Sequence, residues 1–236
     1  MTDKDSTRSA WRRVLANNPV GLQWGKAAEK LRGLQLYRDA VTVFATPGES
    51  LHQARINWLV DGKNLVMPAP SIREGFFFLP AHTVPYKDIS AAVTYKGLNK
   101  SGQLLNNKSI QELSVGLLLN DSLAVDSEGG RIGDGNGFFD LSCALLHELN
   151  GLQQGWTALT FIHEGQISRD LLPQNTWDIK VSGAVTPAKL FTFEPPSQKP
   201  QIFWEMLSKD RIKRIDPLWK LFQKRKVKGS GLKAQG

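Results

Sequence analysis

Residues 129–148 read GGRIGDGNGFFDLSCALLHE, with a glycine at every second position through the middle of the stretch. Residues 115–126 before it are rich in apolar residues, as in a buried strand and turn, and the stretch after the glycines has the apolar content of a packed helix. Glycines accept positive φ and let backbone amides approach a ligand closely. We therefore predict a strand–loop–helix unit of an α/β protein, with Arg131 and Asp140 flanking the loop.

The glycine loop alone allows three interpretations: a phosphate site, a calcium site or a plain turn. The N-terminus of the following helix carries partial positive charge, which suits phosphate. However, the spacing is G-x-G-x-G and not the dinucleotide pattern G-x-G-x-x-G, and the Lys-Ser/Thr pair of a P-loop is missing. Calcium is disfavoured, because Phe138 stands where an oxygen ligand is needed and no Glu closes the loop. Phosphate site and plain turn stay equally open.

Earlier in the chain, a strand–helix–strand order sets the type of sheet. Residues 40–45 are β-branched and apolar and are followed by Pro47-Gly48. Residues 50–63 have helical apolar spacing, and residues 64–70 predict a second strand. Such an order favours parallel pairing of the two strands through the helix between them.

The rest of the chain continues the α/β pattern and contains no internal repeat. The expected elements are helices at 7–18, 20–37, 138–150 and 201–225, strands at 72–79, 115–126, 156–167 and 177–191, and short irregular elements at 80–110.

The composition indicates a globular protein. The chain has 236 residues, 41% of them hydrophobic, which is enough for one large α/β domain with an ordinary core. The single cysteine, Cys143, excludes an internal disulfide and a cysteine metal cluster. The polar N-terminus does not resemble a secretory signal, and no stretch has the roughly 18 apolar residues of a membrane span. We expect a cytoplasmic protein without membrane contact.

The net charge of +8 is concentrated in one segment. Residues 209–236 carry ten Lys/Arg and two Asp, which equals the whole excess, so residues 1–208 are balanced. Basic residues near Trp219 and Phe222 suit a weak contact with RNA. Segments of this kind are also common as solvated appendages, and both interpretations of residues 209–236 stay open.

Hydrolase chemistry has no support in the motifs. His147-Glu148 and His163-Glu164 both lack the second histidine of the zinc motif H-E-x-x-H. No serine stands in a G-x-S-x-G turn. The sequence therefore excludes these two common types of hydrolase site.

The segment RIGDGNGFFD (131–140) resembles the R-L-G-x-G-x-G-Y-Y-D signature of 5-formyltetrahydrofolate cyclo-ligases, also called methenyltetrahydrofolate synthetases. The resemblance covers about residues 8–190. Residues 123–131 stand where that family has PGLGFDxxGxR, and residues 160–187 are similar to its closing strand–loop–strand. The ALLHE and VTP segments are closer to the cyclo-ligase-like paralogues, which include the methenyltetrahydrofolate synthetase domain-containing proteins.

This resemblance implies a three-layer α/β fold, in which a mostly parallel Rossmann-like sheet has helices on both faces. The cyclo-ligase-like domain is expected over residues 1–194, and residues 195–236 are expected to form a Pro-rich linker, a short helix and a basic C-terminal tail. The ligand cleft is expected at the carboxyl ends of the strands.

The function that the resemblance implies is an ATP- and Mg²⁺-dependent ligase acting on a folate substrate. It converts 5-formyltetrahydrofolate to 5,10-methenyltetrahydrofolate: the formyl oxygen on N5 is phosphorylated, N10 attacks the activated carbon, and phosphate leaves. The alternative is a non-cyclising paralogue that binds nucleotide or a folate-like ligand without this turnover.

The site residues follow from the same resemblance. Arg131 is the implied catalytic residue, Asp140 and Asp178 are the implied magnesium ligands, and Glu49 and Phe138 are implied to bind the folate. The implied ATP-binding residues are Arg8, Arg12, Arg131, Gly133, Asp134, Gly135, Asn136, Gly137, Phe138 and Phe139.

Each assignment has a plainer alternative from the residues themselves. Arg131 could be a solvated turn charge, Asp140 a first-turn aspartate favoured by the helix dipole, and Asp178 a simple loop acid. Arg8 and Arg12, four residues apart, share one helical face and could belong to an amphipathic surface helix. Arg8 also stands where the family has a lysine, which keeps the charge but changes the geometry.

The sequence departs from the family pattern at several positions near the implied site. Asp121-Ser122 replace a Pro-Gly pair, and Phe138-Phe139 replace two tyrosines, which keeps a stacking face but removes the hydroxyls. Asp134 places an acid beside the implied triphosphate, which is electrostatically unfavourable unless the acid faces the metal. These departures bear on cyclo-ligase activity more than on the fold.

Overall fold

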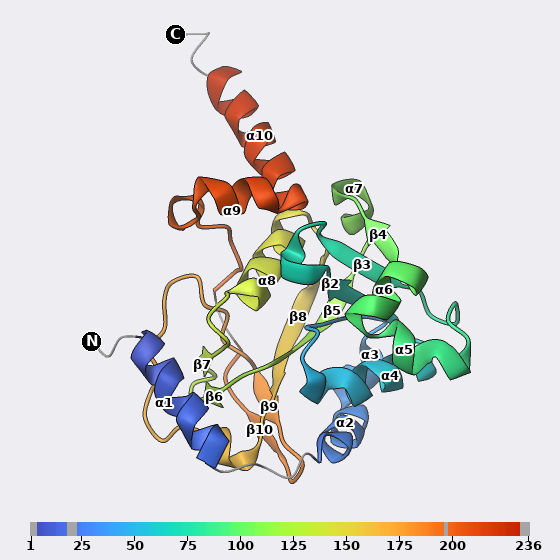
Figure 1. Cartoon of the computed structure of the whole chain (residues 1–236), viewed down its shortest axis with the longest axis vertical. Helices are drawn as coiled ribbons and strands as arrows, with labels where there is room; N and C mark the ends of the chain where they lie inside the picture. Colours follow the sequence, from blue (N-terminus) through green and yellow to red (C-terminus); the bar gives the residue numbers. More distant parts are fainter. Residues whose placement is uncertain (1–3, 18–22, 196–197, 232–236) are drawn as a thin grey trace.

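The computed structural model describes residues 4–17, 23–195 and 198–231, and its centre is an eight-stranded sheet (Figure 1). In spatial order, the strands are β10 (Leu190–Thr192), β9 (Gly183–Val185), β8 (Leu152–Phe161), β5 (Val115–Asp121), β1 (Thr42–Ala45), β2 (Asn64–Pro68), β3 (Phe76–Leu79) and β4 (Gln103–Leu105). A separate small sheet pairs β6 (Ala124–Val125) with β7 (Arg131–Ile132).

The five central strands, from β9 to β2, run parallel, and antiparallel strands close both edges of the sheet. The predicted strand–helix–strand unit is confirmed, since β1 and β2 pair in parallel and flank a helix. The segment 177–191, predicted as one strand, forms the hairpin β9–β10 instead. Pro187 stands in its turn, where Thr186 N–H donates to the Lys189 carbonyl at 2.9 Å.

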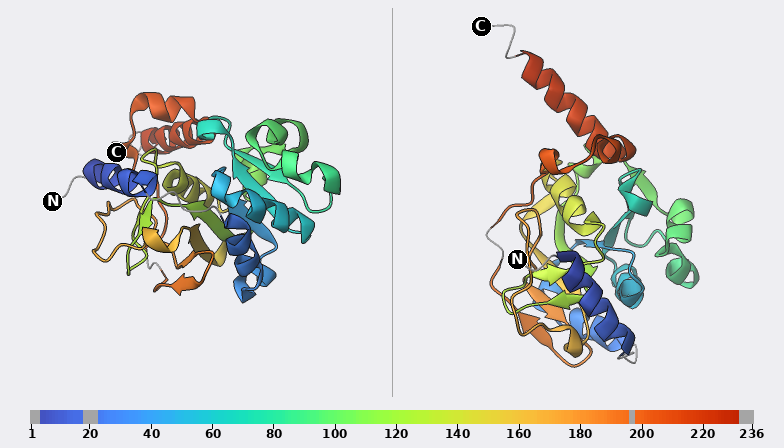
Figure 2. Two further views of the ribbon diagram at one scale, coloured as in Figure 1. Left: turned by 60° about the horizontal axis from the view of Figure 1, so that its bottom comes forward. Right: turned by 60° about the vertical axis from the view of Figure 1, so that its left-hand side comes forward.

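Helices cover both faces of the sheet, as Figures 1 and 2 show, and the three-layer α/β class is confirmed. On one face lie α2 (Trp24–Arg32), α3 (Gln35–Asp39), α4 (His52–Val60), α5 (Ile89–Ala92) and α6 (Tyr95–Ser101). On the other lie α7 (Asn107–Ile110), α8 (Phe138–Glu148), α9 (Lys209–Arg214) and α10 (Asp216–Gly231), while α1 (Lys4–Asn17) lies beside β7. Short 3-10 turns are η1 (Glu49–Leu51), η2 (Pro70–Ile72), η3 (Tyr86–Asp88), η4 (Glu164–Gln166) and η5 (Trp204–Met206).

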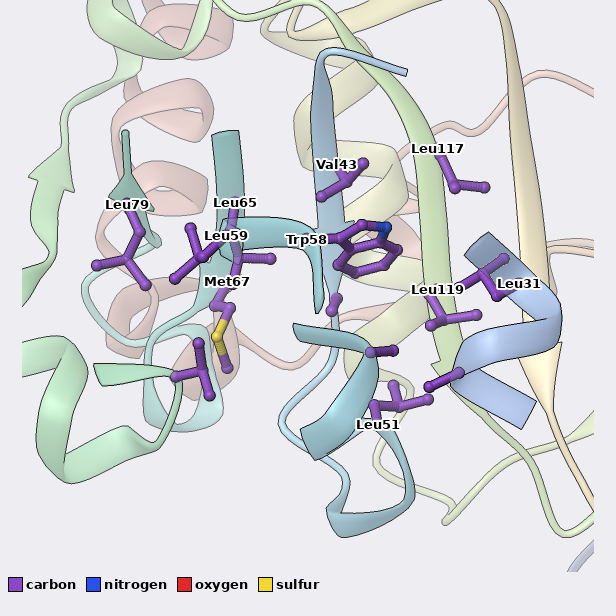
Figure 3. Packing of buried hydrophobic residues seen from close by; sticks show 14 of the residues in the cluster. Leu31, Val43, Leu51, Trp58, Leu59, Leu65, Met67, Leu79, Leu117 and Leu119 are labelled. Carbon is purple, nitrogen blue, oxygen red and sulfur yellow. The ribbon is translucent and has the colours of Figure 1, made fainter. Parts of the chain in front are cut away.

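The central strands are apolar on both faces because helices bury both. Val43 on β1 packs into the core under α2 and α4, whereas its neighbour Phe44 packs into the core under α8. This alternation follows from the period of two in strand side chains. Figure 3 shows Trp58 of α4 lying over the sheet between Val43 and Leu117, and all three side chains are fully buried.

The helix predicted over 20–37 is two helices, α2 and α3, in the part that the structure describes; residues 20–22, and residue 18 of the predicted first helix, lie outside that part. Gly33 closes α2, and Leu34 is extended, with φ −79° and ψ 144°. Glycine is a poor helix former, so the chain turns there. The periodicity of apolar residues alone did not reveal this break.

The C-terminal helices pack on the body of the protein. Ile212, Ile215 and Leu218 are buried in the same core as α8, and the Asp216 N–H donates to the Arg73 carbonyl at 2.8 Å. Beyond this contact, α10 projects away from the body (Figure 2). Residues 232–236 of the predicted basic tail lie outside the described part. No helix in the described ranges is both long enough and apolar enough to cross a bilayer.

Candidate functional site

A cleft of about 1220 Å³ opens at the carboxyl ends of the parallel strands, where a ligand site was expected. One side of the cleft is formed by residues at and after the ends of β1, β2 and β5. The rest of its wall is formed by α1, the glycine loop and the segment before β9. The main lining segments are 46–48, 68–72, 120–123, 133–140, 173–175 and 177–178.

The glycine loop, residues 133–137, joins β7 to α8 in a conformation that favours glycine. Gly135 has φ 102° and Gly137 has φ 64°, so a side chain at either position would be strained. Asp134 turns back on the loop, and its Oδ1 accepts the Asn136 N–H at 2.9 Å. This amide is therefore already engaged, although the resemblance implies that Asn136 binds ATP.

Arg131 and Asp140 form a buried ion pair at the base of the cleft. Arg131 Nη2 donates to Asp140 Oδ1 at 2.5 Å, and the side chains are 5% and 13% exposed. Arg131 Nε donates to the Ile179 carbonyl, and its guanidinium carbon lies 4.5 Å from the centre of the Phe139 ring. The Ile179 N–H donates to the same oxygen of Asp140 at 2.9 Å. Arg131 is thus a fixed cleft residue and not a solvated turn charge.

Asp178 lines the same cleft and is held by α1. Its Oδ2 pairs with Lys4 Nζ and accepts the Asn175 N–H at 2.5 Å. Because Ile179 follows Asp178 directly and binds Asp140, the two implied magnesium ligands are brought together at one wall. Sequence reasoning missed Lys4, whose contact spans 174 positions and leaves no local pattern.

The two carboxylates fit the way in which Mg²⁺ binds beside nucleotides. In the described ranges, no three Asp, Glu, His or Cys side chains gather closely enough to hold a metal ion by themselves. Mg²⁺ usually takes one or two carboxylates and completes its shell with phosphate and water. The contacts above use Oδ1 of Asp140 and Oδ2 of Asp178, so each residue has a second oxygen to offer.

Arg8 and Arg12 bind the glycine loop through its backbone. Arg8 Nε donates to the Gly133 carbonyl at 3.1 Å, and Arg12 Nη2 donates to the Asp134 carbonyl at 2.7 Å. Arg8 also pairs with Asp5 and lines the cleft, whereas Arg12 is not among the lining residues. The amphipathic helix predicted from their spacing exists, and its arginines hold the loop in place.

The opposite side of the cleft contains a carboxylate that sequence reasoning did not assign to the site. Asp121 ends β5, lines the cleft and accepts from Ser50 Oγ at 3.2 Å. Its place at the carboxyl end of a central strand was the available signal. Glu49, the implied folate ligand, is exposed and is not among the lining residues.

The charges that line the cleft sum to a negative value. Five carboxylates (Asp5, Asp121, Asp134, Asp140 and Asp178) face three cations (Lys4, Arg8 and Arg131). Four aromatic rings, of Tyr95, Phe138, Phe139 and Trp177, also line the cleft and offer flat stacking surfaces. Burial raises the pKa of the Tyr95 hydroxyl, which keeps it protonated and able to donate. The cleft can therefore bind a cation together with an anionic, partly aromatic ligand.

Comparison with known proteins identifies the family. The sequence model of the 5-formyltetrahydrofolate cyclo-ligase family matches residues 8–187. The chain belongs to this family. The resemblance read from the segment 131–140 is thereby confirmed, and the matched residues include the loop, Asp140 and Asp178.

Relatives of this family member are methenyltetrahydrofolate synthase domain-containing proteins. The one from Danio rerio is 26% identical over 202 residues, which cover 83% of this chain and 52% of the relative. The one from Mus musculus is 27% identical over 210 residues, covering 86% and 55%. The chain thus spans about half the length of the curated relatives that it matches.

Solved structures of two bacterial synthetases share the fold. The 5,10-methenyltetrahydrofolate synthetase of Aquifex aeolicus aligns with a TM-score of 0.55 and 16% identity, covering 86% of this chain and 99% of that one. The Mycoplasma pneumoniae enzyme aligns with a TM-score of 0.50 and 13% identity, covering 79% and 99%. At these identities, the likeness concerns the arrangement of the chain.

Proposed function

We propose that the protein is an ATP- and Mg²⁺-dependent 5-formyltetrahydrofolate cyclo-ligase-like enzyme that forms 5,10-methenyltetrahydrofolate in the cytoplasm. The observation that carries the proposal is the convergence of the glycine loop, the Arg131–Asp140 pair and Asp178 in one cleft of a cyclo-ligase family member. When bound, ATP would supply the phosphoryl group that turns the formyl oxygen into a leaving group.

The polar residues would act by position and charge. Loop amides and the N-terminus of α8 would face the phosphates, where fixed dipoles stabilise charge as it develops. Arg131 would add a cation that Asp140 and the Ile179 carbonyl hold in place. Asp140 and Asp178 would hold Mg²⁺.

The negative lining of the cleft supports a requirement for the metal. Five carboxylates beside three cations would repel a free triphosphate. A divalent cation held by two of the carboxylates offsets that excess and screens the phosphate charge. We therefore expect the protein to bind the magnesium complex of ATP and to lose most of its ATP affinity when EDTA removes the metal.

The folate would use the aromatic part of the cleft. Phe138, Tyr95 and Trp177 provide faces on which a flat heterocycle can stack. Glu49 stays a proposed ligand for the polar part of the folate, and it would have to turn from its exposed position toward the cleft mouth.

The test is turnover by the purified protein with 5-formyltetrahydrofolate, ATP and Mg²⁺, with the methenyl product separated by chromatography. Asp140→Asn should lower kcat about 100-fold or more, as expected when one fixed electrostatic group is lost. Asp170→Asn, which removes an exposed carboxylate outside the cleft lining, is the matched control and should stay within about twofold of wild type. Equal loss in both variants would contradict the proposal.

A second candidate is a non-cyclising paralogue that binds nucleotide or a folate-like ligand. Asp121 favours it, because this carboxylate lines the cleft at a position where the family signature has proline. Folded protein that binds Mg²⁺–ATP but forms no methenyl product would favour this candidate over the enzyme.

A further inference from the structure

The C-terminal helices reach the glycine loop, although they lie outside the segment that matches the family model. That segment ends at residue 187, and α9 begins at Lys209. Ile212 and Ile215 are 4% and 2% exposed and share a core with Phe139 and Leu141 of α8. This packing sets α9 by α8 (Figure 1), from where the Arg211 side chain reaches the loop that precedes α8.

Arg211 makes the direct contact between α9 and the glycine loop. Its Nη2 donates to the Asn136 carbonyl at 2.5 Å, and its guanidinium carbon lies 5.4 Å from the centre of the Phe138 ring. The side chain is partly buried. A guanidinium can bind a carbonyl in its plane while its face rests on an aromatic ring, which an ammonium group cannot do.

The contact fixes the direction of a backbone amide. In a planar trans peptide, the carbonyl of one residue and the N–H of the next point in opposite directions. Holding the Asn136 carbonyl toward α9 therefore turns the Gly137 N–H away from α9. Arg8 and Arg12 hold the carbonyls of Gly133 and Asp134 in the same way. The N–H groups of Asp134 and Gly135 therefore point away from these two arginines.

We infer that Arg211 is a positioning residue of the nucleotide site, and that α9 supports that site from outside the cleft by holding its loop. The inference rests on the proposed function. Guanidinium groups from the two ends of the chain hold the loop by its carbonyls, which leaves the amides of Asp134, Gly135 and Gly137 directed away from the arginines. Gly137 directly precedes the first turn of α8, and that turn carries Asp140. The orientation of the Gly137 peptide therefore also sets where the turn begins.

The test uses Arg211→Ala and Arg211→Lys, with Arg214→Ala as the matched control. Arg214 is an exposed arginine on the same helix, so the control removes the same charge. Arg211→Ala should raise KM for Mg²⁺–ATP about tenfold, the value of one charge-assisted hydrogen bond. KM for the folate should rise by a smaller factor, because Arg211 also rests on the Phe138 ring. Arg211→Lys should recover less than half of this loss on a free-energy scale. Arg214→Ala should match wild type.

A second measurement does not depend on turnover. With ¹⁵N-glycine labelling, the order parameter of the Gly137 amide should fall from about 0.85 toward 0.6 in Arg211→Ala and not in Arg214→Ala. If Arg211→Ala matches Arg214→Ala in this measurement, the role of Arg211 is refuted. If wild type has no turnover but Gly137 loosens as expected, the proposed function fails and the positioning role stands.

Discussion

Replacing Asp140 by asparagine should destabilise the fold as well as impair the site. Arg131 is 5% exposed, so water cannot replace the lost counter-charge. Asparagine keeps an Oδ1 that can accept the Ile179 N–H, so the substitution isolates the effect of charge. Breaking a buried pair by removing one partner costs about 3–5 kcal/mol. Because Asp140 is 13% exposed, we take the lower end, about 3 kcal/mol.

This free energy corresponds to about a 150-fold fall in the folding equilibrium constant. In a chain of this length it should lower Tm by about 6–12 °C. The assay is urea unfolding at pH 7 followed by tryptophan fluorescence, with a thermal melt of the same samples. Arg131→Met and the double variant complete the cycle.

The double variant has no unpaired buried charge, so its loss should be smaller than the sum of the single losses by about 2 kcal/mol. The exposed control Asp170→Asn should change stability by less than about 0.5 kcal/mol. The ion-pair reasoning fails if Asp140→Asn costs under about 1 kcal/mol, or if the losses of the two single variants simply add.

Three further predictions concern the scaffold. Gly97→Ala would place a Cβ 1.9 Å from the Ala91 carbonyl oxygen, so the free energy of unfolding in urea should fall by about 2–3 kcal/mol. The Cβ of Gly25→Ala on α2 would meet no atom within 4 Å, so the free energy of unfolding should rise by about 0.5–1 kcal/mol. Ile215→Ala should cost about 2–5 kcal/mol if the C-terminal helices fold with the body, and no change would contradict that packing. Burial raises the pKa of the Cys143 thiol, so the unfolded chain loses this proton first and stability falls as pH rises above about 8.5, by at most about 1.4 kcal/mol per pH unit. The measurement is the difference in free energy of unfolding between wild type and Cys143→Ala at pH 7 and at pH 10. An unchanged difference would refute the raised pKa of Cys143.

The fold could be predicted from the sequence wherever one local signal dominated. Residues 40–45 and 64–70 predicted strands, and β1 and β2 lie there, because both faces of a parallel sheet are buried, which gives apolar runs. The break at Gly33 and the hairpin around Pro187 were missed, since each depends on a turn inside a segment whose apolar pattern continues. The packing of α9 and α10 was missed as well. The many basic residues of these helices suggested a solvated segment. Their apolar residues Ile212, Ile215 and Leu218 instead pack in one core with α8.

The candidate site could be predicted as a list of residues but not as a set of contacts. Arg131, Asp140 and the loop were found through a compact motif, and the structure places them together. The partners of Arg8 and of Arg211 lie 125 and 75 positions away in the sequence. Contacts over such separations are set by the packing of the helices and leave no trace in local spacing.

The attachment of both ends of the chain to the glycine loop makes ligand binding and helix docking reciprocal. If docking of α9 strengthens nucleotide binding tenfold, a bound nucleotide must strengthen the docking of α9 by the same factor, about 1.4 kcal/mol. The same linkage applies to α1, whose Arg8 and Arg12 hold the neighbouring peptides. An occupied cleft would then be reported by the docking of α9, where a fluorescent label or a protease could detect whether the site is filled.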